Sequence, residues 1–193
     1  MTTIRRLTLL ALAAAPVLTA IPAAAQTQRP AGAPCLTKAA ELKERVAELN
    51  APDPMRRVAM FNEMLTSCDP AQREIAYERG FASTEQAVRA LTLRAKLRDA
   101  KMLILELAAP DGDQQAALAV KQHGGGQVDL PITAYDADKG ELKIGNGYVS
   151  RVSGTLLNLN YGYCKGVLQL AEGTVLAGTV NCSNIPLRGT IRL

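Results

Sequence analysis

The chain has 193 residues, of which 48% are hydrophobic and 21% charged, with a formal net charge of +4 and four cysteines. This composition is typical of a globular protein and excludes collagen, a coiled coil, intrinsic disorder and a polytopic membrane protein. A phosphate-binding surface needs concentrated positive charge, so this mild excess predicts no nucleic acid partner.

Residues 1–25 have the three parts of a secretory signal peptide. Arg5 and Arg6 form the charged start, an apolar stretch runs from Leu7 to Ile21, and small residues end at Ala25. We expect cleavage after about Ala25, a flexible mature start at 26–36 and no transmembrane segment afterwards. This predicts a periplasmic or secreted bacterial protein, with a retained N-terminal anchor as the alternative.

Because disulfides form in oxidising compartments, we expect the cysteines of an exported chain to form disulfides. Cys35 and Cys68 lie in the N-terminal half, where the sequence predicts helices. Cys164 and Cys182 lie in the C-terminal half, where it predicts strands. Of the three connectivities that four cysteines allow, we therefore predict 35–68 and 164–182. A zinc site is the alternative, but the chain has no CxxC motif, so we predict no metal.

Residues 53–100 divide into three copies of a 16-residue unit, which is the signature of an internal repeat. The first position is acidic (Asp53, Asp69, Glu85) and the fifth is arginine (Arg57, Arg73, Arg89). Proline follows the acid in the first two copies. An acidic cap followed by proline predicts the start of a helix in each unit.

These units resemble the HEAT-like helical repeats, whose Asp-Pro start and internal arginine recur here, although HEAT repeats usually have a longer period. The resemblance implies a stack of short helices over 37–100 that binds a protein partner on a curved surface. Five arginines are the residues that we predict could contact such a partner: Arg57, Arg73, Arg89, Arg94 and Arg98. The alternative is structural, with each repeated arginine pairing with a cap acid of its own or an adjacent unit.

Residues 101–126 form a connecting segment between the two halves. The apolar run 102–107 is either a strand or the end of the last helix, since periodicity does not separate these for a short run. Asp113 is expected to cap a short helix over 114–122, which the glycines at 124–126 end.

From residue 127 to 193 the pattern is that of antiparallel strands. Glycines recur at 154, 166, 178 and 189, and short alternating segments follow them. A hairpin turning at Gly173 places Cys164 directly opposite Cys182, which predicts a cross-strand disulfide. The predicted fold class is therefore α+β: a stack of helical repeats, then a small, mainly antiparallel β domain forming a meander, a sandwich or a partial barrel.

No arrangement of residues points to catalysis, so we predict no catalytic residues and no cofactor. His123 has no nucleophile or carboxylate at a recognised spacing. Residues 136–141 fit a hairpin turn better than a calcium loop. Tyr148, Tyr161 and Tyr163 are typical of sheet packing, with a small aromatic surface for a sugar or peptide as the alternative.

We therefore predict an exported, non-enzymatic binding protein of the bacterial periplasm or envelope, which engages an envelope protein through its helical repeats. One alternative is a β domain that binds a small apolar ligand or a glycan. The second is a hydrolase whose active site has no recognisable motif. The sequence determines neither the partner nor the oligomeric state.

Overall fold

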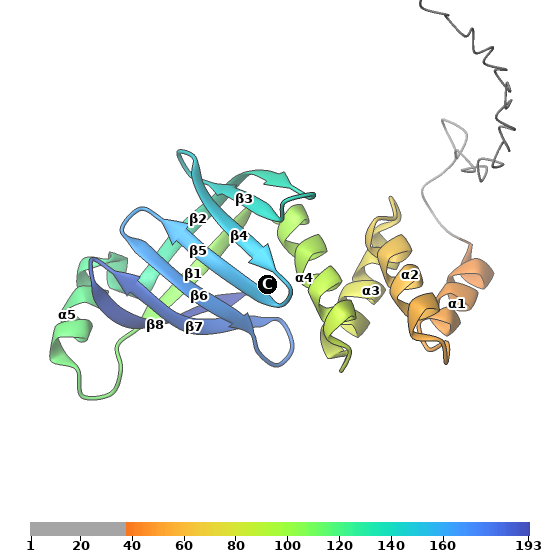
Figure 1. The fold of residues 1–193 in the computed structure, drawn as a ribbon, viewed down its shortest axis with the longest axis horizontal. Helices are drawn as coiled ribbons and strands as arrows, with labels where there is room; N and C mark the ends of the chain where they lie inside the picture. The colour runs from red at the N-terminus through yellow and green to blue at the C-terminus, as the bar shows by residue number, and fades with distance from the viewer. Residues whose placement is uncertain (1–37) are drawn as a thin grey trace, which may run out of the picture. The chain divides into compact units, whose positions relative to one another are not determined.

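The computed structural model describes residues 38–193 (Figure 1). The predicted signal peptide at 1–25, the predicted flexible start at 26–36 and Cys35 lie outside these residues. The first helices are α1 (Ala39–Glu48), α2 (Pro54–Leu65), α3 (Pro70–Ala82) and α4 (Gln86–Asp99), and α5 (Gln114–Gln122) follows the first strand. The strands are β1 (Met102–Ala108), β2 (Gln127–Asp136), β3 (Glu141–Ile144), β4 (Tyr148–Ser153), β5 (Leu156–Tyr161), β6 (Cys164–Leu170), β7 (Val175–Cys182) and β8 (Ile185–Arg192).

Helices α2 to α5 begin where the acidic residues of the capping pattern predicted. The side chains of Asp53 and Asp69 accept hydrogen bonds from backbone N–H groups of the first turns of α2 and α3, and each is followed by proline. Asp113 does the same for α5. Glu85 precedes α4 without a side-chain cap bond, because its carboxylate pairs with Arg57 instead. Local capping chemistry therefore defines the starts of α2, α3 and α5.

The eight strands form a closed antiparallel barrel in the order β1 to β8. The predicted fold class, α+β with a helical repeat stack and a small β domain beginning at residue 127, is wrong. Residues 38–193 instead contain five helices and this barrel, whose first strand is the ambiguous run at 102–107. Leu105 of β1 pairs with Ile191 of β8 and closes the sheet. The spacing of hairpins predicts pairing only between strands that follow each other in the chain. It therefore could not predict the pairing of β1 with β8.

The barrel is filled by its own side chains, because alternate residues of each strand point inward. Large inward side chains are fully buried: Leu105, Leu130, Leu142, Ile144, Leu157, Leu168, Leu176 and Leu187. They belong to one hydrophobic cluster that also includes Leu93 and Leu97 of α4. The helices and the barrel thus share a continuous core.

Two glycines lie opposite each other inside paired strands of this barrel, Gly178 in β7 and Gly189 in β8. A Cβ atom on Gly178 would lie 2.1 Å from the carbonyl oxygen of Val167, and one on Gly189 would lie 2.4 Å from a methyl of Val180. Glycine therefore permits the close approach of strands that a small closed barrel needs.

Helices lie at both ends of the barrel (Figure 1). At one end α4 contacts the turns that join β2 to β3 and β6 to β7, through hydrogen bonds from Arg94 and Arg89. At the other end α5 packs against β1 and β8. His123, which follows α5, stacks on Tyr163 of the β5–β6 turn with ring centroids 4.5 Å apart.

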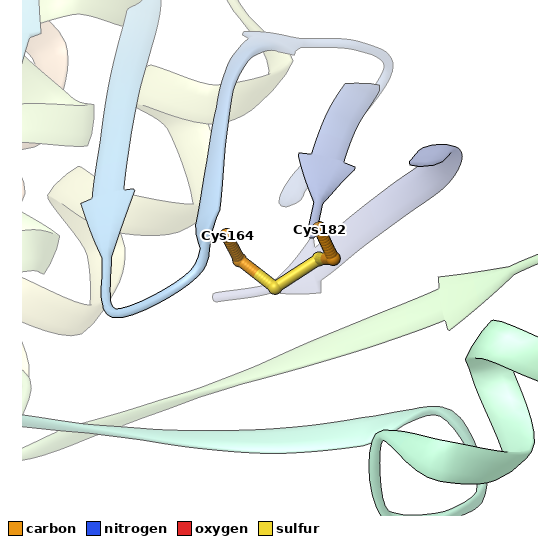
Figure 2. The surroundings of a disulfide bond; sticks show 2 residues. All are labelled: Cys164 and Cys182. Carbon is orange, nitrogen blue, oxygen red and sulfur yellow. A yellow bond between two sulfur atoms is a disulfide. The ribbon is translucent and has the colours of Figure 1, made fainter. Parts of the chain in front are cut away.

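The predicted hairpin register of β6 and β7 is confirmed, with Cys164 opposite Cys182 and Leu168 opposite Gly178. The two cysteines form a disulfide that links the adjacent strands (Figure 2). Both are buried and point into the barrel at the end near α5. A disulfide is compatible with an extracellular or periplasmic protein.

Within residues 38–193, none of the helices has the length and apolar character needed to cross a membrane.

Candidate functional site

The repeated arginines Arg57 and Arg73 make the same contact in successive units. Each donates a hydrogen bond to the backbone carbonyl six residues earlier, Ala51 O and Ser67 O respectively. Arg57 also donates to Glu85 Oε1 at 2.7 Å. In both units the guanidinium thus bonds to the loop that precedes its own helix. Arg57 also links that loop to Glu85, the residue before α4.

The other three predicted arginines bind backbone carbonyls at greater distances along the chain. Arg89 donates to the carbonyl oxygens of Leu170, at 3.2 Å, and Ala171 in the β6–β7 turn. Arg94 donates to Ala137 O at 2.7 Å.

Arg98 donates to Leu65 O at 3.0 Å, at the end of α2. All five arginines therefore have intramolecular partners, and these partners are largely carbonyls rather than the cap acids considered from the sequence. Their contact with a partner protein stays a prediction.

A polar network joins α3 to the end of α4. The hydroxyl of Tyr77 donates to Asp99 Oδ2 at 2.7 Å, and Arg98 donates to Asp99 Oδ1 at 2.8 Å. Burial, and then the bond to this carboxylate, raise the pKa of the Tyr77 phenol well above its usual value. Burial alone would raise the Asp99 pKa, but the bonds from Arg98 and Tyr77 outweigh it and hold that pKa below its usual value.

A cavity of about 160 Å³ lies where α2 and α4 meet the barrel. We call it the junction cavity. Its walls are Asn62, Leu65 and Thr66 at the end of α2, Arg94 and Arg98 with other residues of α4, and Tyr135 and Ala137 at the end of β2. These residues come from segments up to 75 positions apart in the sequence, so only the tertiary structure brings them together.

Tyr135 faces the junction cavity because of a bulge in β2. Ile132 pairs with Ile144 and Ala134 pairs with Lys143, so Thr133 is an extra residue in this strand. Before the bulge the inward side chains of β2 have even numbers, and after it the inward position falls on Tyr135. A bulge re-aims the side chains that follow it. Here it turns an aromatic hydroxyl towards the helices.

The hydroxyl oxygen of Tyr135 is buried and has no hydrogen-bond partner among the described residues. Buried hydroxyls are ordinarily hydrogen-bonded, since an unmet bond is unfavourable. The charged side chains in the cavity wall are Arg94 and Arg98, both partly buried, and the wall includes no carboxylate. The cavity therefore combines two cations with an unmet donor.

Sequence reasoning named Arg94 and Arg98 but missed Asn62, Thr66 and Tyr135. A polar side chain on an otherwise regular helix or strand carries no local sign that it lines a cavity. The bulge that orients Tyr135 also has no clear sequence signal, because Thr133 is an ordinary strand residue.

At the opposite barrel end the predicted aromatic residues form two pairs. Tyr148 and Tyr161 meet edge to face with centroids 5.4 Å apart, and Tyr163 stacks on His123. The second pair joins α5 to the β5–β6 turn, which is a packing role. Asp136 accepts hydrogen bonds from the N–H groups of Asp138 and Lys139, as the hairpin-turn interpretation expects.

The disulfide prediction is confirmed for Cys164 and Cys182. Cys68 is exposed between α2 and α3, and its predicted partner Cys35 lies outside the described residues, so that bond stays a prediction. The described part of the chain contains no group of three or more His, Cys, Asp or Glu side chains placed to hold a metal ion.

A scan against protein-family models, a search of curated proteins and a search of solved structures each found no match to this chain. The resemblance of residues 53–100 to HEAT-like repeats stays a prediction.

Proposed function

We propose that this chain is an exported, non-enzymatic binding protein of the bacterial periplasm or envelope, which engages a protein partner at the side where α2–α4 meet the barrel. One observation carries the proposal: the junction cavity holds two cationic side chains and a buried hydroxyl without a partner. Groups of this kind favour recognition of a polar ligand, because binding supplies the bonds that folding left unmet.

The filled barrel supports a scaffold role for the β structure. A carrier of small apolar molecules needs an open lumen, whereas here Leu130, Leu157 and Leu176 are completely buried in the interior. A rigid barrel also suits the precise placement of a binding site on its edge. We therefore place the proposed binding side at the barrel end that α4 contacts.

Export is supported by the disulfide between Cys164 and Cys182, since such bonds persist in oxidising compartments. The signal-peptide pattern at residues 1–25 supports the same location.

Site-specific photo-crosslinking tests the proposal with the full chain. A photoreactive phenylalanine analogue replaces exposed Asn62 in the cavity wall or, as a matched control, Val167 on the barrel wall, which is 48% exposed. After irradiation in living cells, we expect one discrete crosslinked protein from position 62 and none from position 167.

The identity of that protein comes from mass spectrometry of the adduct. A discrete adduct from position 167 alone would assign binding to the barrel wall and overturn the proposal. Co-purification of a small apolar molecule, with no adduct from either position, would overturn it in favour of a ligand carrier.

A further inference from the structure

We infer that the junction cavity is a binding site for a small oxyanion, a carboxylate or phosphate group, held by Arg94, Arg98 and the hydroxyl of Tyr135. This inference deepens the proposed function by naming the chemical group that enters the site, and it rests on that function for the source of the group. It is carried by the hydrogen-bond donors and by the charge of the cavity wall.

Both guanidinium groups are held in place and still have donors to spare. A guanidinium has five N–H donors. Arg94 uses one for Ala137 O, and Arg98 uses two, for Leu65 O and for Asp99. These bonds fix the arginine side chains against the barrel and the end of α2. The remaining N–H groups are available to a ligand that accepts several hydrogen bonds, as an oxyanion does.

The charge of the cavity wall favours an anion. Its two charged side chains are cations, and both come from α4 one turn apart. Two acids that follow wall residues in the chain, Asp99 and Asp136, already have partners, and Asp99 pairs with Arg98 itself. Asp99 is bonded to Arg98 and Tyr77. Asp136 accepts from its own turn and pairs with Lys139 at 3.5 Å. One positive charge, that of Arg94, therefore faces the cavity without a carboxylate partner.

The hydroxyl of Tyr135 supplies the observation that is independent of charge. The bulge at Thr133 turns this side chain inward, and its oxygen is buried without a partner among residues 38–193. An apolar side chain at this position would avoid an unmet bond. A bound oxyanion would accept a hydrogen bond from the phenolic hydroxyl and so remove the penalty of leaving it unpartnered.

The volume of the cavity suits a small group. About 160 Å³ accommodates a carboxylate or a phosphate with one or two attached atoms, while the polar residues Asn62 and Thr66 lie at its exposed side. A side chain or chain end presented by a larger partner can enter through that side. The site thus suits capture of an acidic group that projects from a surface.

The test is an NMR titration of the ¹⁵N-labelled full chain with sodium acetate and, separately, with sodium phosphate, against sodium chloride at matched ionic strength. We expect saturable shifts of the backbone amides of Thr66, Arg94 and Ala137 with at least one of the two probes. Saturation by acetate alone assigns a carboxylate source, and saturation by phosphate alone assigns a phosphate source.

Two variants and one control complete the experiment. Tyr135→Phe removes the hydroxyl and should weaken binding about tenfold, the usual effect of losing one hydrogen bond to a charged group. Arg94→Gln should weaken it by more than tenfold, because it also removes the charge. Tyr148→Phe, at the far barrel end, should leave the affinity unchanged.

Absence of saturable shifts with both probes would overturn the oxyanion site. Equal affinities of wild type and Tyr135→Phe would also overturn it, since that variant keeps the ring and its packing. If the crosslink from Asn62 persists while neither probe binds, the proposed function stands and this inference fails. If a probe binds but no crosslink forms, the oxyanion site stands and the proposed protein partner fails.

Discussion

Replacing Tyr135 by phenylalanine should stabilise the ligand-free protein, whereas the same change at Tyr77 should destabilise it. The two tyrosines differ in one respect that matters here. The hydroxyl of Tyr77 donates to Asp99 at 2.7 Å, while that of Tyr135 is buried without a partner among the described residues. Tyr77→Phe therefore removes a hydrogen bond that the folded protein makes, whereas Tyr135→Phe removes a buried hydroxyl that has no partner among the described residues.

The magnitudes follow from hydrogen-bond energetics. A bond to a charged group contributes about 1.5–3 kcal/mol, and a buried unmet polar group is unfavourable by about 1–3 kcal/mol. Because Asp99 keeps its bond from Arg98, we expect Tyr77→Phe to lower the free energy of unfolding by about 1.5 kcal/mol. We expect Tyr135→Phe to raise it by about 1 kcal/mol. For a chain of this size, 1 kcal/mol corresponds to about 2–4 °C in Tm.

The assay is urea unfolding followed by circular dichroism, supported by calorimetry, in a buffer without phosphate or carboxylate. Those anions are excluded because an occupied junction cavity would stabilise the wild type selectively. A loss of stability in Tyr135→Phe equal to that in Tyr77→Phe would show that the Tyr135 hydroxyl makes a bond in solution. The Tyr135 hydroxyl would then not be an unpartnered donor, and the oxyanion site would lose this support.

Three further predictions concern the disulfide, a barrel glycine and an acid. Replacing Cys164 and Cys182 by alanine should lower the free energy of unfolding by about 3 kcal/mol in the chain-entropy model, given their separation of 18 residues; an unchanged urea midpoint would contradict this. Gly178→Ala should lower it by about 1–3 kcal/mol through overpacking against a carbonyl oxygen, and calorimetry showing no fall in Tm would refute the close approach. Because its pKa is depressed in the folded state, Asp99 stabilises the protein above its unfolded pKa, and this contribution is lost as pH falls through the folded pKa. The free energy of unfolding should therefore fall less steeply with decreasing pH in Tyr77→Phe than in the wild type. Identical curves would argue against the bond between Tyr77 and Asp99.

The site could be predicted from the sequence only in part. The sequence predicts Arg94 and Arg98 as residues for partner contact, yet their bonds to Ala137 and Leu65 connect segments that are distant in the chain. Tyr135 was not named, because its inward position depends on a bulge that changes the side on which every later residue of β2 lies.

Features that depend on residues close together in the chain could be predicted from the sequence alone. Asp53, Asp69 and Asp113 begin helices because a carboxylate and the backbone N–H groups it caps lie within three residues of each other. The pairing of Cys164 with Cys182 followed from the register of one hairpin.

The closure of the barrel and the position of the junction cavity depend on contacts between distant parts of the chain. The pairing of Leu105 with Ile191 joins strands at opposite ends of the β region, and the contact of Arg89 with Ala171 joins a helix to a distant turn. Such contacts form because they bury apolar surface and satisfy carbonyl groups together, and no short stretch of sequence contains both partners. The cavity and its unmet hydroxyl are consequences of that global packing.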